Sequence, residues 1–570
     1  MKEILNNLFE NAIREAFENA LDCDPCIQLA MRQEYGDYQA NFAMRLAKEL
    51  KMKPVEVANA VINKLQDKKI FKSLEASGPG FINITLADEF LTEQLQSLIS
   101  DERLGIKKEK ETQTIVVDYA NANVAKEMHV GHIRSIVIGD AIVRLFNFLG
   151  YHTIKQSHLG DWGTQFGMLI EYLFETGKQD QLHSVSDLDA VYKKSKQRFD
   201  EDAVFADKAR ARVVALQQGD EQTLGIWKIL VKVSLKYFQQ IYNKLDVLIT
   251  EEDARGESFY NPMLADVLKE LEQSGLAMES DGAKVIFLDE FTTPYIIQKK
   301  DGGYLYATTD LAAAKFRINE LHATRLIYLT DARQKQHFSM LFASLNKAGW
   351  VKKNVRLEHV PFGTILGPDN KPFKTRSGES IRLIALLEEA ENRALQITRE
   401  KNPEMSEERL QHIAHVIGIG ALKYADLRAD KVKDYVFDWD KLLSFDGNTA
   451  PYLQNAYVRI NAIFRKGNIQ FDAIKENKIL LTDKIEHLLA IKLLEFPDLV
   501  YSLANDLALH RMCDYLHDVA STYHKFYEHC PILSTEDNNI RNSRLLLSNI
   551  TARTLKLGLD LLGIQTLEQM

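Results

Sequence analysis

The stretch Ile115–Gly167, IVVDYANANVAKEMHVGHIRSIVIGDAIVRLFNFLGYHTIKQSHLGDWGTQFG, decides the fold. It opens with the short apolar run Ile115–Val117, which is typical of a buried parallel strand. A polar loop follows, and the motif His129–His132 then opens an apolar-periodic helix. A second strand is expected at residues 153–156. Strand, loop, helix and strand in this order predict a βαβ unit of a parallel α/β sheet.

The motif HVGH suits a nucleoside triphosphate. A helix N-terminus at the carboxyl end of a parallel strand favours anions. Gly131 lets the backbone approach a flat base, while His129 and His132 donate to phosphate oxygens. Two alternatives remain open from these four residues alone. The histidines are also compatible with an ordinary helix start, or with a metal pair that lacks an obvious third ligand.

The flanking sequence narrows the choice. HVGH resembles the HIGH motif of class I aminoacyl-tRNA synthetases, and VDYANANVAKEMHVGHIRS is similar to the arginyl-tRNA synthetase version of it. HLGDWGTQFGMLI, GGYLYATTDLAAAKFR, FGTILG…KPFKTRSG and DGNTAPYLQNAYVRI match that family in the same order. The resemblance covers nearly the whole chain. It implies a Rossmann-type catalytic domain with a parallel sheet, an α+β N-terminal domain and an all-α C-terminal domain.

Composition limits the remaining classes of protein. The chain has 570 residues, enough for several domains, and lacks a run of eighteen apolar residues, so no membrane span is expected. Its N-terminal helix pattern carries acids and does not look like a signal peptide, which predicts a cytoplasmic protein. Four cysteines do not make a disulfide framework, and Cys23 and Cys26 form half of a zinc motif, so no metal site is expected. A net charge of −9 argues for local basic patches rather than bulk attraction to RNA.

The order of motifs predicts four parts. Residues 1–108 form an appended domain that contacts tRNA, and residues 109–380 form the catalytic domain with a helical insertion at about 176–285. Residues 381–447 are a connecting helical region, and residues 448–570 form an all-α anticodon-binding domain.

In the appended domain, residues 81–86 read as a strand after a Gly-Pro-Gly turn. The resemblance implies that Phe81 and Asn83 contact a D-loop base of tRNA by stacking and edge reading. A lysine-rich face lies nearby, and such a face is more typical of a solvated helix surface than of an RNA contact (Lys64, Lys68, Lys69, Lys72).

Tyr306 and Asp310 are four residues apart near a helix expected from Thr309, so they share a face if the helix begins by then. A phenol beside a carboxylate suits a guanidinium, although Asp310 is also in place to cap the helix. The resemblance assigns Tyr306, Asp310 and Gln334 to the arginine side chain. It places Asp118 beside the ammonium group of the substrate. It assigns four further residues to the α-amino and carboxylate end of the substrate (Asn121, Ala122, Asn123, His132).

The loop KPFKTRSG resembles the KMSK loop of class I enzymes, but Ser377 stands where the second lysine is expected. The resemblance implies that Lys126, before the HVGH motif, supplies the missing charge, with Lys374 or Arg376 in support. The predicted catalytic set is therefore His129, Gly131, His132, Lys126, Lys374 and Arg376, and the predicted ATP contacts are His129, Gly131, His132 and Lys374.

The helix pattern that begins near Pro451 carries aromatic and cationic residues at helical spacing. In the family this helix contacts tRNA, which predicts one further set of contacts (Pro451, Tyr452, Gln454, Tyr457, Arg459, Arg465). Alternatively, its tyrosines belong to the core.

These residues imply attack of the arginine carboxylate on the α-phosphate of ATP, followed by transfer to the terminal ribose of tRNA. The nucleophiles come from the substrates, so catalysis depends on positioning and charge stabilisation, with Mg²⁺ on the pyrophosphate. Family behaviour implies that tRNA binds before arginine is activated, and a monomer is expected by resemblance. The alternatives are another class I synthetase, a small-molecule adenylating ligase and a non-catalytic RNA-binding relative.

Overall fold

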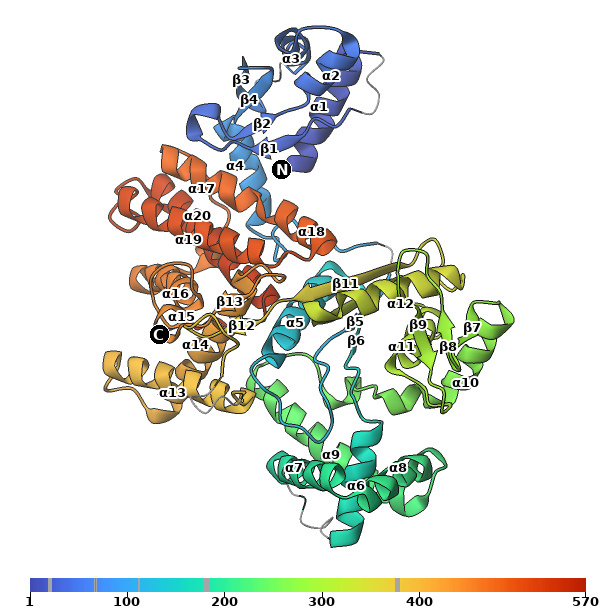
Figure 1. The fold of residues 1–570 in the computed structure, drawn as a ribbon. Helices are drawn as coiled ribbons and strands as arrows, with labels where there is room; N and C mark the ends of the chain where they lie inside the picture. The colour runs from blue at the N-terminus through green and yellow to red at the C-terminus, as the bar shows by residue number, and fades with distance from the viewer. Residues whose placement is uncertain are drawn as a thin grey trace.

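The protein is elongated, with the N-terminal domain at one end and a helical lobe at the other (Figure 1). The computed structural model describes residues 1–18, 23–65, 67, 69–110, 113–177, 182, 184–374 and 380–570. Among these residues, no helix has the length and apolar character needed to cross a membrane.

The N-terminal domain packs helices on one face of an antiparallel sheet in the order β1-β2-β4-β3. Along β4, buried and half-buried residues alternate, because successive side chains of a strand point to opposite faces. Ile82 and Ile84 are fully buried, whereas Phe81 and Asn83 lie on the other face. The elements are α1 (Lys2–Ala16), β1 (Ile27–Leu29), β2 (Tyr38–Ala40), α2 (Ala43–Leu50), α3 (Pro54–Ile62), β3 (Phe71–Ser77), β4 (Phe81–Leu86) and α4 (Asp88–Leu98).

A parallel sheet in the order β11-β10-β5-β6 forms the centre of the catalytic domain. The predicted strand–loop–helix–strand unit is confirmed, with β5 at the middle of the sheet and almost wholly buried. The helix of this unit begins at His132, three residues later than expected. The reason is that Val130 donates to the carbonyl of Ile381 and Leu383 donates to that of Met128, which keeps residues 128–130 extended. The elements are β5 (Thr114–Asp118), α5 (His132–Leu149) and β6 (His152–Gln156).

The region after β6 forms a helical lobe, α6 (Thr164–Thr176), α7 (Val185–Glu201), α8 (Ala203–Gln217) and α9 (Glu221–Lys244). The next part differs from the helical expectation, because it contains an antiparallel sheet in the order β7-β8-β9. Helix α10 and this sheet share a hydrophobic core with α11 of the catalytic domain. The elements are α10 (Glu257–Gln273), β7 (Ala277–Ser280), β8 (Ala283–Ile286) and β9 (Tyr295–Gln298).

The second half of the catalytic domain begins with α11, which starts at Tyr306 and not at the expected Thr309. It continues through β10 and α12 to β11, which completes the parallel sheet. The elements are α11 (Tyr306–Asn319), β10 (Arg325–Asp331), α12 (Lys335–Lys347), β11 (Arg356–Phe362) and β12 (Ile365–Leu366). The connecting elements that follow are α13 (Leu383–Lys401), α14 (Glu407–Arg428), β13 (Tyr435–Val436) and α15 (Trp439–Leu442).

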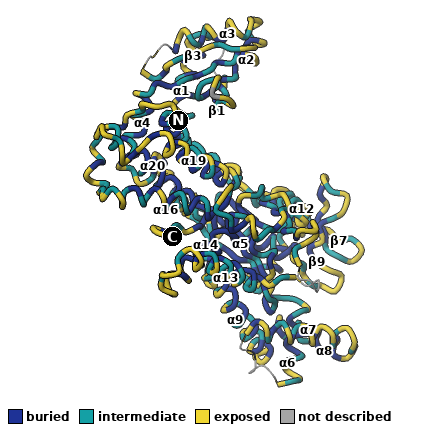
Figure 2. Tube along the Cα trace, turned by 90° about the vertical axis from the view of Figure 1, so that its left-hand side faces the viewer, coloured by how far each residue is buried: buried dark blue, intermediate teal, exposed yellow. Residues whose placement is uncertain are grey.

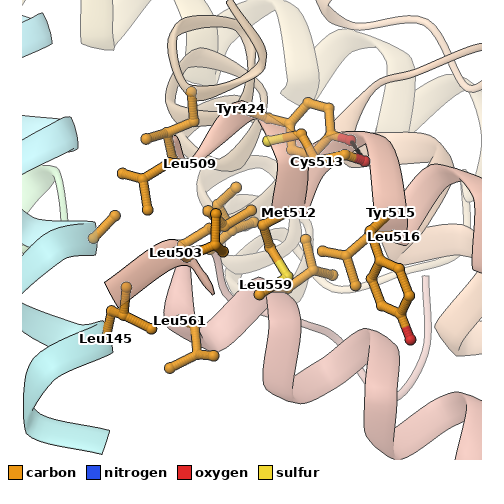
Figure 3. Packing of buried hydrophobic residues seen from close by; sticks show 14 of the residues in the cluster. Leu145, Tyr424, Leu503, Leu509, Met512, Cys513, Tyr515, Leu516, Leu559 and Leu561 are labelled. Atoms are coloured by element: carbon orange, nitrogen blue, oxygen red, sulfur yellow. Dashed lines mark hydrogen bonds between the residues drawn. The ribbon is translucent and has the colours of Figure 1, made fainter. Parts of the chain in front are cut away.

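The C-terminal helices pack directly against α5. Figure 3 shows Leu145 of α5 beside Leu561 of α20, within a cluster that includes Leu503, Met512 and Leu559. The buried trace is concentrated where α5 and α14 meet (Figure 2). The fully buried Arg134 of α5 also forms an ion pair with Asp426 of α14, at 2.9 Å. The remaining elements are α16 (Ala450–Gly467), α17 (Lys484–Leu494), α18 (Phe496–Asp506), α19 (His510–His529) and α20 (Asn538–Leu561).

A prediction concerns the packing between α5 and the loop that follows β5. A Cβ added at Gly139 would overlap the buried ring of Tyr119, so Gly139→Ala should destabilise the protein by about 1–3 kcal/mol. Gly225 in α9 has open space around it, and Gly225→Ala should stabilise the protein by about 0.5–1 kcal/mol. Denaturant unfolding of both variants measures the difference. A Gly139→Ala midpoint at or above that of the wild type would show that this close approach is not needed.

Candidate active site

The candidate active site is a cleft of about 840 Å³ at the carboxyl ends of β5 and β10. The chain connections leave these neighbouring strands in opposite directions, which opens a crevice for a ligand. His132 and Asp310 both line this cleft, together with all the other predicted arginine and ATP contacts (Asp118, Asn121, Ala122, Asn123, His129, Gly131, Tyr306, Gln334, Lys374).

The loop between β5 and α5 is held in a strained shape. Ala120 and Ala125 have φ angles of 59° and 63°, a left-handed conformation that costs a non-glycine residue about 1–3 kcal/mol. Their backbone N–H groups donate to the hydroxyls of Ser135 and Ser234, both at 2.9 Å. These buried hydrogen bonds fix the loop against α5 and against α9.

The two imidazoles of the HVGH motif present donors to the cleft. The backbone N–H of His129 donates to Nδ1 of His132 at 3.0 Å, and the N–H of Gly131 donates to Nδ1 of His129 at 3.1 Å. Nδ1 of His129 accepts, so the proton of its neutral ring is on Nε2, whereas Nδ1 of His132 also lies 3.1 Å from the carbonyl oxygen of His129, a contact in which only the ring nitrogen can donate. Burial lowers the pKa of His132 to about 4, and burial with the charge of Arg333 lowers the pKa of His129. Both rings are therefore neutral near neutral pH, and His129 offers Nε2–H to the cleft.

The lining of the same cleft also includes a carboxylate slot. Tyr306 and Asp310 lie one turn apart at the start of α11, because the helix begins at Tyr306. Oδ2 of Asp310 is 2.6 Å from Nε2 of His337, and the ring of Tyr306 packs against the same imidazole. Sequence reasoning missed His337, which comes three residues after Gln334 on α12 and carries no motif of its own.

Glu257, at the start of α10, is a second carboxylate that sequence reasoning missed. It lines the same cleft, and among the described residues none donates a hydrogen bond to its carboxylate. Burial, with the negative charges of Asp161 and Asp310, raises the pKa of Glu257 to about 8. A carboxyl group of this kind becomes ionised when a cation enters beside it. A slot with Asp310 and Glu257 on neighbouring walls suits a guanidinium.

Asp118 already has partners within the protein. Its carboxylate forms an ion pair with the buried Arg317 at 2.6 Å and accepts a hydrogen bond from Nδ2 of Asn121 at 2.7 Å. It thereby orients Asn121, whose Oδ1 accepts from the N–H of His158. Its contact with a substrate ammonium remains a prediction.

The predicted phosphate contacts are divided in space. Lys374 lines the cleft and forms an antiparallel bridge with Ser380. Lys126 does not belong to the lining, and its ammonium lies 4.6 Å from the ring centre of Tyr192 on α7. Arg376 falls outside the described residues.

The predicted tRNA contacts require a correction. Pro451, Gln454 and Tyr457 are buried in the C-terminal core, so their side chains do not present a surface to RNA. Gln454 donates to the carbonyls of Val416 and Gln565. The remaining predicted positions keep exposed or half-buried side chains (Phe81, Asn83, Tyr452, Arg459, Arg465).

Within the described ranges, no group of three or more histidine, cysteine or acidic side chains is placed to hold a metal ion. Cys23 and Cys26 are free thiols, both half-buried.

The fold agrees with comparisons to known proteins. Residues 94–439 match the family model described as tRNA synthetases class I (R), catalytic domain. Residues 453–570 match the DALR anticodon binding domain, and residues 3–86 match the arginyl tRNA synthetase N terminal domain.

Curated relatives cover the same length. The chain is 49% identical to an arginine–tRNA ligase of Salmonella dublin and 48% identical to that of Salmonella gallinarum, each over 96% of both chains. Among solved structures, the arginyl-tRNA synthetase of Plasmodium falciparum superimposes with a TM-score of 0.87 at 32% identity, over 100% of this chain and 99% of that one. The Thermus thermophilus arginyl-tRNA synthetase has the same fold, with a TM-score of 0.79 at 22% identity and complete coverage of both chains. The chain therefore belongs to the arginyl-tRNA synthetase family of class I aminoacyl-tRNA synthetases.

Proposed function

We propose that this protein is an arginine–tRNA ligase, which activates L-arginine with ATP and transfers it to the terminal ribose of its cognate tRNA. One observation carries the proposal beyond family membership. A single cleft is lined both by the neutral imidazoles of His129 and His132 and by the carboxyl groups of Asp310 and Glu257. These two sets of groups suit a triphosphate and a guanidinium.

Arginine binds with its side chain in the carboxylate slot. Asp310 and Glu257 receive the N–H groups of the guanidinium, and Tyr306 and Gln334 close the slot. Asp310 exchanges its contact with His337 for a contact with the substrate. Asn121, Ala122, Asn123 and His132 hold the α-amino and carboxylate end, as family resemblance implies, with Asp118 acting directly or by orienting Asn121. A neutral analogue offers no charge to replace the contact of Asp310 with His337 or to ionise Glu257, which explains selectivity without an editing domain.

Activation takes place at the imidazole end. The arginine carboxylate attacks the α-phosphorus of ATP, and the bond from that phosphorus to the bridging oxygen breaks, so that pyrophosphate leaves. Nε2–H of His129 and His132 donate to oxygens that gain negative charge as the pentacovalent phosphorus forms. Gly131 allows close approach of the nucleotide, and Lys126, Lys374 and Arg376 supply positive charge. Lys126 must leave Tyr192 to take part.

Mg²⁺ is expected to enter with the triphosphate and to neutralise the pyrophosphate. Asp331 is a carboxylate in the lining near the imidazoles, but both of its oxygens accept hydrogen bonds from Arg333 at 2.7 Å. The phosphate oxygens and water are therefore the principal ligands that fit here.

The N-terminal and C-terminal domains hold tRNA. We assign residues 1–108 to the appended domain, 109–380 to the catalytic domain, 381–447 to the connecting region and 448–570 to the anticodon-binding domain. The exposed Arg459 and Arg465, with the half-buried Tyr452, are the candidate contacts on α16, and Phe81 and Asn83 are those on β4. We expect a monomer that works in the cytoplasm.

Pyrophosphate exchange with each amino acid, with and without cognate tRNA, tests the proposed function. Arginine with tRNA should support exchange, and the other amino acids should not, because they lack a guanidinium to pair with the slot. Exchange with a different amino acid would indicate another class I synthetase. Exchange with arginine that never leads to charged tRNA would indicate an adenylating ligase.

The carboxylate slot makes a separate prediction. Asp310→Asn should raise the KM for arginine by about 100-fold or more, because one partner of a buried charge pair is lost. The KM for ATP should stay within about twofold of the wild-type value, since Asp310 lies at the far end of the cleft. Steady-state kinetics with each substrate varied in turn provide both values. An equal rise in both KM values would show that Asp310 does not belong to an arginine slot.

Glu257 predicts a pH dependence of arginine binding. Its carboxyl group is protonated in the free enzyme below a pKa of about 8 and is ionised in the complex, so arginine binding releases a proton. The Kd for arginine should therefore fall about tenfold per pH unit from about pH 6 and level off above about pH 8. Titration calorimetry in buffers with different ionisation heats measures the released proton, and Glu257→Gln should abolish it. A wild-type profile as flat as that of the variant would exclude this role for Glu257.

A further inference from the structure

The segment Ser157–Asp161, which follows β6, lies between the two ends of the proposed arginine site. On one side it is paired with the loop after β5, because Val124 donates to the carbonyl of Gly160 and Gly160 donates to that of Ala122. On the other side it is paired with the start of α10, because Arg255 donates to the carbonyl of Ser157 and Glu257 donates to that of Leu159. This segment therefore joins Asn121 and Asn123 to Glu257 through backbone hydrogen bonds.

Asp161 makes the last contact of this segment with α10. Its Oδ1 accepts from the backbone N–H of Ser258 at 2.9 Å, and its Oδ2 accepts from the hydroxyl of Ser258 at 2.6 Å. The indole N–H of Trp227 donates to the carbonyl of Asp161 at 2.8 Å. A Cβ at Gly256 would overlap the Asp161 carboxylate, so this carboxylate lies directly against the helix start. It acts as an N-terminal cap supplied by another part of the chain.

Hydrogen bonds as well as packing hold the start of α10 around Glu257. Behind it lies a second hollow of about 1610 Å³, which is lined by Asp161, Gly256 and Ser258 among others. Glu257 faces the active-site cleft from the same short stretch. The fully buried Tyr260 stacks on His158 at the start of α10, and the hydrogen bonds of Asp161 add to this packing in holding Glu257 in place.

The charged groups around Glu257 come from three elements. Asp161 belongs to the segment after β6, Asp310 lies on α11 with His337 of α12 as its partner, and His158 lies beside Asp161. Burial raises the pKa of Asp161, and hydrogen bonds from Ser258 oppose that rise. After burial, Asp161 is the largest cause of the raised pKa of Glu257. Removal of the charge at Asp161 should therefore lower the pKa of Glu257.

We infer that Asp161 is a positioning residue that fixes Glu257 at a set distance from Asn121 and Asn123, so that the segment Ser157–Asp161 sets the length of amino acid the site accepts. The inference rests on the proposed function and deepens it. Asp161 touches neither substrate and acts through the start of α10.

The main test compares Asp161→Asn with Ser258→Ala. The asparagine keeps an acceptor for the N–H of Ser258 but removes the charge, so the pH midpoint of arginine binding should fall by about one unit. Ser258→Ala removes the hydroxyl donor but keeps the charge, so its midpoint should not fall. The KM for ATP should stay within about twofold in both variants. An Asp161→Asn midpoint equal to that of the wild type would overturn the inference.

A second measurement tests the length selectivity. The ratio of KM values for homoarginine and arginine should be lower by about tenfold in Asp161→Ala, because one methylene group is normally worth about that factor in a fitted site. If Asp161→Ala does not fold, the pH midpoint of arginine binding in Asp161→Asn decides whether the inference stands. Pyrophosphate exchange by the wild-type protein with arginine tests only the proposed function. If the wild type shows this exchange, an unchanged length selectivity in a folded Asp161→Ala or an unchanged pH midpoint in Asp161→Asn overturns the positioning role alone. If the wild type shows no exchange with arginine, both the proposed function and the positioning role are overturned.

Discussion

The pairing of β5 with β10 at the middle of the parallel sheet is the constraint on which the rest of the structure depends. Both strands are buried, and their carboxyl ends define the floor of the cleft. The loop after β5 leads to the imidazoles, and the segment after β10 leads to Gln334 and His337. The sheet thus determines which chemical groups meet, although those groups lie more than 200 residues apart in the chain.

Electrostatics divides the cleft into two unlike ends. Both imidazoles of the histidine pair are neutral, and the backbone N–H of Gly131 holds Nδ1 of His129, so this ring offers Nε2–H to a phosphate. A neutral donor needs no proton removal before the reaction, and its position is fixed before the charge develops. In the carboxylate slot, burial and the charges of Asp161 and Asp310 raise the pKa of Glu257 to about 8. The arrival of a guanidinium favours the ionised form of Glu257, which pairs the substrate cation with two carboxylates and makes the binding of arginine selective.

The sequence predicted the βαβ unit and the imidazole motif because both depend on local patterns of a few residues. It also placed Tyr306 and Asp310 on one face, although the helix begins three residues earlier than expected. Glu257 was missed because its role depends on the distant Asp161 and Asp310. The tRNA contacts on α16 were partly wrong for a different reason, since helical spacing alone does not say which face is buried, and Gln454 and Tyr457 face the core.

A crystal structure of the protein with a non-hydrolysable arginyl-adenylate analogue tests the central claim most directly. The account predicts guanidinium nitrogens within about 3.2 Å of both Asp310 and Glu257, with His337 displaced from Asp310 or sharing it. The group that replaces the α-phosphate should accept hydrogen bonds from Nε2–H of His129 and His132. A ligand with its guanidinium away from the two carboxyl groups, or with its phosphate mimic away from the imidazoles, would contradict it.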